Sequence, residues 1–427
     1  MFFYSDAELI RSDTADAQSV RAYNAGVLLN RIWSSDGGVS RADLARQTGL
    51  SRSTVSAIVS SLISSGLIAE THVARSRAGR PPIALAFRDD AFGIIGIEMG
   101  ASHVAAVLCD PRGRVLFKRH SEWDTEGDPA GTLRLIHRFV SEAAHSAGQR
   151  RVIGLGLAVP CPLDSTEPGM LSRRILPAWK DICIGEELFQ RHQLPTYVDN
   201  DANLGALAER WWGAATDTPC ATYIKVATGV GAGHIVDGRL FRGATGIAGE
   251  IGHTTVTVNG GHKCRCNLHG CLEAEIGSAS IVQRAREGIA AGEATRLEDD
   301  VNLSLAKVVE AALQGDLFAQ KLIDQAGQYL GVAIANLLNL MNPARVIVGG
   351  RLATAGDLLL VPLRRAILDR ALWTSIERAD VVLSELGDSH VAIGAATLVL
   401  EAALAAPGNF THPRQATRLA HTGASRP

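Results

Sequence analysis

The chain has 427 residues, of which 46% are hydrophobic, and its formal net charge is −2 at neutral pH. This size and composition suffice for two or three domains with large cores, and the charge excludes a protein that attracts nucleic acid through its overall charge. No apolar run approaches the roughly 20 residues needed to span a bilayer, and the first residues lack the pattern of a signal peptide. We therefore expect a soluble, cytoplasmic protein.

The N-terminal part of the chain has a charge of its own. Between Ser19 and Pro82 there are eight basic and three acidic residues, which gives a local net charge of +5. Such an asymmetry is typical of a nucleic-acid-binding module.

Apolar periodicity and capping residues in this part predict a helix-turn-helix. A helical apolar stripe precedes Gly37-Gly38, Ser40 caps a short helix that stops at Gly49, and Ser51 caps a third helix. Helix, glycine-containing turn and helix is the helix-turn-helix arrangement. The alternative is a three-helix packing module with a solvated basic loop.

Two sets of side chains in this module are expected to contact DNA. One lies at the N-terminal end of the third helix, the end of a recognition helix that faces the bases. The other lies in an arginine-rich segment, expected to be the tip of a β-wing that reaches phosphates or the minor groove. The predicted DNA contacts are Arg52, Ser53, Thr54 and Ser56 on the helix and Arg75, Arg77 and Arg80 on the wing.

The rest of the chain contains an internal repeat. The segments that begin at Ile95 and Ile224 each read as a strand, a glycine-containing turn, a second strand and a turn with Asp and Gly. Two such halves predict a duplicated α/β fold with a cleft between two lobes. Glycine-rich turns let backbone N–H groups approach a phosphate, although tight hairpins use the same glycines.

The expected organisation follows from these patterns. Helices are expected at 128–147, 200–211, 303–313, 317–339 and 391–405. The expected domains are an N-terminal arm (1–18), a winged helix-turn-helix DNA-binding domain (19–82), a first α/β lobe (83–215), a second α/β lobe with a metal loop (216–405) and a disordered tail (406–427).

A cluster of metal-ligand residue types lies in the second lobe. It contains His253, Cys264, Cys266 and Cys271, and three thiolates with one imidazole complete a tetrahedral zinc site. The seven cysteines are irregularly spaced, which favours a reducing compartment and metal binding over a disulfide framework. The alternative is three ordinary buried thiols.

Several hydroxyl acceptors are expected around the cleft. Asp199-Asn200-Asp201 follows a strand-like segment and opens a helix, while Glu250 and Glu273 flank the zinc loop. Carboxylates accept strong charge-assisted hydrogen bonds, so this set suits a polyol such as a sugar. His253 could bind zinc through one ring nitrogen and a ligand through the other. The alternative for Asp199 or Asn200 is a helix N-cap.

These motifs together resemble the ROK family of repressors, open reading frames and kinases, over roughly Val20 to Ala405. They are Val159-Pro160-Cys161-Pro162, Leu176-Pro177-Ala178-Trp179, Asp199-Asn200-Asp201-Ala202-Asn203, Gly246-Ile247-Ala248-Gly249-Glu250-Ile251-Gly252-His253 and Cys264-x-Cys266-x4-Cys271-Leu272-Glu273. Gly79-Arg80-Pro81-Pro82 after the winged helix is similar to the xylose- and glucose-type repressor branch.

The resemblance implies a winged helix-turn-helix followed by an actin-like, ribonuclease-H-like sugar-kinase fold. It implies zinc at His253, Cys264, Cys266 and Cys271, and sugar contacts from Asn200, Asp201, Glu250, His253 and Glu273. In the kinases of the family, the acid that matches Asp201 is the general base on the accepting hydroxyl.

The sequence departs from these kinases in its first phosphate turn. The kinases carry Asp-x-Gly-x-Thr where this chain has Glu98-Met99-Gly100-Ala101-Ser102, and Arg351 follows two glycines where the kinases have a third. Phosphoryl transfer depends on sub-ångström positioning, so we expect no enzyme. Asn267, Cys161 and Arg174 are further departures, at the zinc loop, between two prolines and near the sugar site.

We therefore expect a sugar-responsive, DNA-binding transcriptional regulator of carbohydrate metabolism genes, in particular a repressor, with Zn²⁺ as its metal. Its expected partners are operator DNA, a monosaccharide or related sugar, and further copies of the chain in a homodimer or tetramer. One alternative is an ATP-dependent ROK-type sugar kinase that kept a DNA-binding head. Another is a body that docks to a second protein and binds no sugar.

Overall fold

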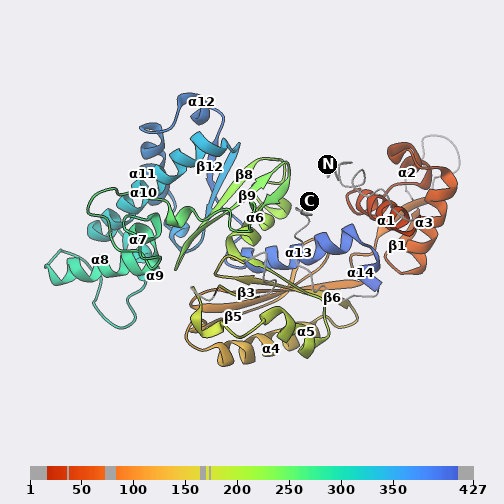
Figure 1. Cartoon of the computed structure of the whole chain (residues 1–427), viewed down its shortest axis with the longest axis horizontal. Helices are drawn as coiled ribbons and strands as arrows, with labels where there is room; N and C mark the ends of the chain where they lie inside the picture. Colours follow the sequence, from red (N-terminus) through yellow and green to blue (C-terminus); the bar gives the residue numbers. More distant parts are fainter. Residues whose placement is uncertain (1–16, 36–37, 73–82, 164–169, 173–174, 412–427) are drawn as a thin grey trace.

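The computed structural model describes residues 17–35, 38–72, 83–163, 170–172 and 175–411. A winged module lies at one end of the molecule, and two α/β lobes form the remainder (Figure 1). Across the described ranges, no helix is both long and apolar enough to cross a membrane.

The winged module contains three helices and a two-stranded antiparallel sheet. Its elements are α1 (Ala17–Trp33), α2 (Arg41–Thr48), α3 (Arg52–Ser64), β1 (Ile68–His72) and β2 (Ile83–Phe87). Ser40 and Asp43 form a capping box at the start of α2, and Gly49 ends that helix at a φ of 71°. Ser51 accepts a hydrogen bond from the Thr54 N–H at the start of α3. The predicted helices and their caps are confirmed.

The module extends further along the chain than the sequence indicated. Strand β2 pairs with β1 from Ile68 opposite Phe87 to His72 opposite Ile83, and the Leu85 N–H donates to the Val39 carbonyl at 2.9 Å. The hydrogen bonds of β2 therefore belong to the winged module. The expected boundary after residue 82 is corrected to a point after Phe87.

Each lobe is built on one five-stranded mixed sheet. The first has the order β5-β4-β3-β6-β7 and the second the order β10-β9-β8-β11-β12. The strands of the first sheet are β3 (Phe92–Met99), β4 (His103–Cys109), β5 (Val115–Glu122), β6 (Arg151–Val159) and β7 (Thr196–Asn200). The strands of the second sheet are β8 (Ala221–Val226), β9 (Val230–Val236), β10 (Arg239–Phe241), β11 (Arg345–Gly349) and β12 (Asp380–Leu383).

The two sheets share one topology. In each, three antiparallel strands are extended by two parallel ones. The predicted duplicated α/β fold is confirmed.

Two helices, α6 (Asp201–Trp212) and α13 (His390–Ala405), pack against each other between the sheets, α6 on β8 and β9 and α13 on β3 and β6. Gly96 allows the close approach of α13 to β3, because a Cβ at this position would lie 1.9 Å from the Ala392 carbonyl oxygen. Helix α13 was expected in the second lobe. The structure instead places it on the first sheet. Buried residues surround the whole helix, because the first sheet packs on one side of it and α6 on another.

The remaining helices cover the outer faces. The first sheet is covered by α4 (Pro129–Ser146) and α5 (Ile184–His192). The second lobe contains α7 (Leu272–Ile276), α8 (Ser278–Ala290), α9 (Leu305–Leu313), α10 (Leu317–Met341), α11 (Asp357–Leu368) and α12 (Trp373–Ile376). The five helices expected from the sequence are all present, with bounds that differ by at most two residues.

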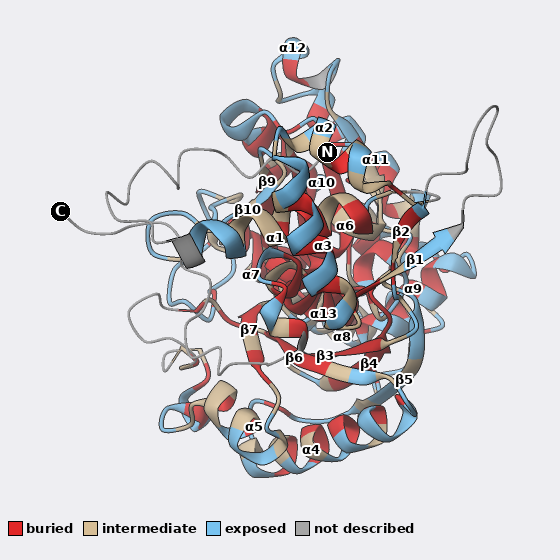
Figure 2. Cartoon of the chain, turned by 90° about the vertical axis from the view of Figure 1, so that its right-hand side faces the viewer, coloured by how far each residue is buried: buried red, intermediate tan, exposed pale blue. Residues whose placement is uncertain are grey.

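The winged module is packed onto the body. Trp33, in the last turn of α1, lies with its ring centroid 5.3 Å from that of Trp211 and 6.3 Å from that of Trp212. Its indole N–H donates to the Pro111 carbonyl at 3.1 Å. One apolar cluster runs from the module into the first sheet and α13, and the view from this end shows buried residues behind the exposed surface of α3 (Figure 2).

The C-terminal segment contradicts part of the expected disorder. Residues Gly408–Thr411 form helix α14, and the Phe410 side chain is buried. Its ring centroid lies 5.7 Å from that of Phe87 and 5.2 Å from that of Phe92. One aromatic side chain therefore anchors a segment whose composition predicts disorder. The rest of the expected tail, 412–427, lies outside the described residues.

Candidate functional site

A cleft opens between the lobes where several loops meet. The N-terminus of α6, the turn after β3, the turn between β8 and β9, and the segment from residue 250 to 273 line it, with an empty volume of about 670 Å³ including its open mouth. Every residue predicted to contact a sugar is found here: Asn200, Asp201, Glu250, His253 and Glu273.

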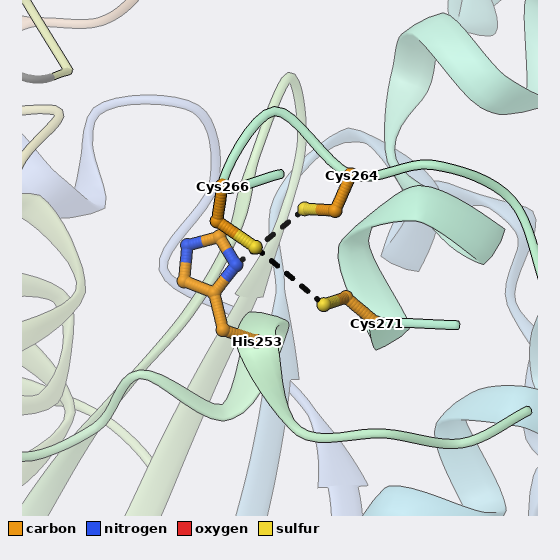
Figure 3. A group of neighbouring side chains, drawn as sticks. All are labelled: His253, Cys264, Cys266 and Cys271. Carbon is orange, nitrogen blue, oxygen red and sulfur yellow. Dashed lines mark hydrogen bonds between the residues drawn. The ribbon is translucent and has the colours of Figure 1, made fainter. Parts of the chain in front are cut away.

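The four predicted metal ligands converge beside this cleft (Figure 3). All four ligand atoms lie within 4.8 Å of one another. The sulfurs of Cys266 and Cys271 are 3.7 Å apart, and the Cys264 sulfur is 3.6 Å from Nδ1 of His253. A tetrahedral zinc ion, with bonds of about 2.3 Å to sulfur and about 2.0–2.1 Å to nitrogen, requires separations of about 3.8 and 3.6 Å. Both of these separations match the values that such an ion requires.

Local backbone geometry holds the ligands in place. Cys271 is the N-cap residue of α7, and the Cys264 N–H donates to the Leu268 carbonyl at 2.8 Å. Asn267 has a φ of 70°, a left-handed conformation that asparagine tolerates better than most residues other than glycine. The departure at Asn267 therefore leaves the turn intact. Cys266 is exposed, so the alternative of three ordinary buried thiols does not describe it.

His253 faces both the metal cluster and the cleft. Its Nδ1 points at the thiols, while its Nε2 lies 3.7 Å from Oε2 of Glu250. A carboxylate at the second ring nitrogen of a metal-bound histidine fixes the tautomer and the ring orientation. Burial raises the pKa of Glu250, His253 opposes that shift, and the carboxylates of Glu273 and Asp201 add to it.

The turn from β7 into α6 is largely structural. Oδ1 of Asn200 accepts hydrogen bonds from the N–H groups of Ala202 and Asn203 at 3.0 and 3.2 Å, which makes Asn200 the N-cap of α6. Asp199 accepts hydrogen bonds from Arg242 at 2.6 and 3.1 Å and from the Asn203 amide at 3.0 Å. The N-cap alternative is therefore confirmed for Asn200.

Asp201 belongs to an ion triad that the sequence analysis did not anticipate. The ammonium of Lys225 donates to Oδ2 of Asp201 at 2.9 Å and to Oε1 of Glu98 at 2.7 Å. Burial tends to raise the pKa of Glu98, but Lys225 and His103 hold it well below its usual range. Burial tends to lower the pKa of Lys225, but Asp201 and Glu98 raise it above its usual value. Glu98 and Lys225 are thus both ionised.

Arg265 is a second site residue that the sequence did not predict. Its Nε donates to Oε1 of Glu273 at 2.7 Å and its Nη2 to Oε2 at 3.2 Å. Oε2 of Glu273 also accepts from the Val230 N–H at 3.0 Å. Glu273 is therefore held by protein groups, and Asp201 and Glu250 are the predicted acidic acceptors with capacity left for a ligand.

Cys161 also lines the cleft. Burial raises the pKa of its thiol to about 12. The thiol is therefore neutral, and we assign it no reactive role.

The predicted DNA contacts are only partly described. Arg52, Ser53 and Ser56 are exposed on α3, and Thr54 is half-buried with its hydroxyl 2.8 Å from that of Ser51. The predicted wing residues Arg75, Arg77 and Arg80 lie outside the described residues, as does Arg174.

Comparisons with known proteins agree with this architecture. A family model described as "ROK family" matches residues 94–402, and one described as "Winged helix-turn-helix DNA-binding" matches residues 28–69. A xylose repressor of Caldicellulosiruptor bescii is 30% identical over 374 residues, which cover 86% of this chain and 93% of the relative.

Solved structures that match the fold include a regulator and a kinase. The first is a ROK family transcriptional regulator described as a homologue of the Escherichia coli MLC protein, with a TM-score of 0.77, 28% identity, and coverage of 92% of this chain and 98% of its own. The second is a ROK family glucokinase from Streptomyces griseus in complex with glucose and AMPPNP, with a TM-score of 0.64, 28% identity, and coverage of 72% and 98%.

Proposed function

This chain belongs to the ROK family, and we propose that it is a sugar-responsive transcriptional repressor of carbohydrate metabolism genes. The winged module binds operator DNA and the cleft binds a monosaccharide or a related sugar. The repressor and regulator matches span the winged module as well as the lobes, whereas the glucokinase match covers 72% of this chain. This difference supports a regulator over an enzyme.

The observation that carries the proposal is the course of helix α6. The helix begins at Asp201 in the cleft and ends at Trp211 and Trp212, which contact Trp33 of the winged module. Its 12 residues span about 18 Å at about 1.5 Å per residue. One helix therefore connects the expected sugar site with the winged module that is expected to bind DNA.

A sugar would act by favouring one arrangement of the lobes. It can shift that equilibrium only by its differential affinity for the two arrangements. In a homodimer, or in each dimer of a tetramer, the two α3 helices need a separation of roughly 34–36 Å to enter successive major grooves. A movement of α6 against Trp33 changes that separation and releases the operator.

We assign Zn²⁺ to His253, Cys264, Cys266 and Cys271, in a structural role. Zinc bound there supplies crosslinks between segments distant in sequence. The segment of His253 carries Glu250, and the segment of the cysteines carries Arg265 and Glu273. The ion would thereby fix the wall of the cleft that the sugar contacts.

The main alternative is a sugar kinase with a DNA-binding head. A kinase needs an acid free to accept the proton of the attacking hydroxyl. Here a glutamate, Glu98, stands in the first phosphate turn where the kinases carry an aspartate, and its side chain is bound to Lys225. We therefore assign the cleft to sugar binding without phosphoryl transfer.

The test combines DNA selection with ligand screening of the full-length protein. Fragments bound from a random DNA pool define the operator, and thermal unfolding is then measured with a panel of mono- and disaccharides. We expect a near-palindromic consensus and at least one sugar that both raises the melting temperature and changes operator affinity. Absence of a preferred DNA sequence, or of any responding sugar, would contradict the proposal.

A further inference from the structure

Lys225 occupies an unusual place for a lysine. It is the penultimate residue of β8, a strand whose residues are all buried, and its side chain is 10% exposed. It lines the cleft together with Asp201, whereas Glu98 is not among the lining residues. The ammonium therefore stands between a buried carboxylate behind it and a cleft-facing carboxylate beside it.

We propose that Lys225 is a ligand-contacting residue that donates a hydrogen bond to one hydroxyl group of the sugar. The same hydroxyl group donates a hydrogen bond to Asp201. This assignment rests on the proposed function and names the chemistry of one subsite. An ammonium has three N–H groups, and the described residues accept from two of them, through Glu98 and Asp201. The third serves the ligand.

The geometry gives this subsite a matched donor and acceptor. The predicted acidic residues of the cleft, Asp201, Glu250 and Glu273, only accept hydrogen bonds while ionised. A hydroxyl group both donates and accepts, so it needs a donor close to its acceptor. Lys225 and Asp201, whose bonded atoms are 2.9 Å apart, form such a pair.

The pair selects the class of ligand. A neutral hydroxyl satisfies both partners. A protonated amino group has no lone pair and cannot accept a hydrogen bond from Lys225. A deoxy position leaves the third N–H group of Lys225 without an acceptor, which costs binding free energy. The cleft should therefore favour a sugar with a free hydroxyl at this position over its deoxy and amino analogues.

The decisive variants separate ligand contact from charge balance. In the wild type the triad of Glu98, Asp201 and Lys225 has a net charge of −1. The double variant Glu98→Gln/Lys225→Met keeps that formal charge, since Asp201 is then the one charged residue type of the three, and removes the ammonium donor. Glu98→Gln alone keeps the donor and is the reference. Lys321→Met, an exposed lysine of α10, is the matched control for a lysine-to-methionine change.

Calorimetry gives the affinities of the full-length proteins. The probe is whichever of D-xylose and D-glucose binds the wild type more tightly, with its monodeoxy and monoamino analogues. We expect the double variant to bind about 10- to 100-fold more weakly than Glu98→Gln, as for loss of a hydrogen bond to a charged group. At one position the wild type should prefer hydroxyl over hydrogen and amine, and the double variant should lose that preference.

Equal affinity of the double variant and Glu98→Gln would overturn the assignment, because Lys225 would then act only by neutralising Glu98. Retention of the full analogue preference in the double variant would overturn it as well. If neither sugar binds the wild type while other saccharides of the panel do, the same comparison is made with the best of them. If no sugar binds at all, the proposed function fails and this assignment fails with it.

Discussion

Replacing Lys225 with methionine should make the free energy of unfolding decrease as pH rises from 5 to 8. In the folded wild type, Lys225 and His103 hold the pKa of Glu98 below its usual 4.5. A depressed carboxyl pKa contributes stability that is present above the unfolded pKa and lost as pH falls through the folded one. Between pH 5 and 8, Glu98 therefore contributes no pH dependence to the free energy of unfolding of the wild type.

Among the residues that the structure describes, Lys225 alone is ion-paired with both carboxylates, and the variant loses it. Glu98, with a side chain 4% exposed, is left with His103 at 3.4 Å and the more distant His390, and burial drives its pKa above the unfolded value. Glu98 then binds a proton on folding. By linkage, stability is present at low pH and is lost as pH rises, by at most about 1.4 kcal/mol per pH unit for each proton.

The size of the effect follows from the burial of the triad. Removing one partner of a buried ion pair costs about 3–5 kcal/mol, and that cost should be largest at pH 8 and smaller at pH 5. Asp201→Asn should cost much less, because Glu98 and Lys225 remain as a neutral pair. Urea unfolding of the wild type, both variants and Lys321→Met between pH 5 and 8 measures these differences. A Lys225→Met protein as stable as the wild type at pH 8, or one without a pH slope, would refute the reasoning.

Three further predictions follow from the metal cluster, the cleft and the winged module. The purified protein should contain about one zinc ion per chain and Cys266→Ser should lose it, as measured by elemental analysis with Cys220→Ser as control; a metal-free wild type contradicts the assignment. Asp201→Asn should weaken sugar binding by about 1.5–3 kcal/mol and leave operator binding without sugar nearly unchanged; calorimetry showing unaltered sugar affinity would place the sugar elsewhere. Arg52→Ala should cost about 1–3 kcal/mol on the operator and relax preference at one base pair, whereas equal affinity for operator and random DNA in a salt series of the wild type would exclude a specific reader.

Local signals in the sequence predicted the parts of the structure that depend on neighbouring residues. Ser40, Gly49 and Ser51 bound the helices of the winged module as expected, because caps act within one turn. The cluster of candidate metal ligands was predicted for a similar reason, since donor type and short spacing suffice to define it. The glycine and aspartate turns likewise marked both lobes.

The residues that were missed act across the fold. Lys225 is a polar residue in an apolar strand, and only the folded arrangement of the two lobes brings it to Glu98 and Asp201. Arg265 separated two ligand cysteines and was treated as a spacer. A lysine within an apolar strand is itself a usable signal, because a buried charge requires a partner. Phe410 gave no periodic pattern, so its burial needed the structure.

The most direct test of the account is a closed thermodynamic cycle between sugar and operator. Operator affinity is measured with and without saturating sugar, and sugar affinity with and without operator. We expect both ratios to be equal, as linkage requires, with a coupling of about 1–3 kcal/mol, or roughly 5- to 150-fold. An operator affinity that saturating sugar leaves unchanged would contradict the central claim that the cleft controls the DNA reader.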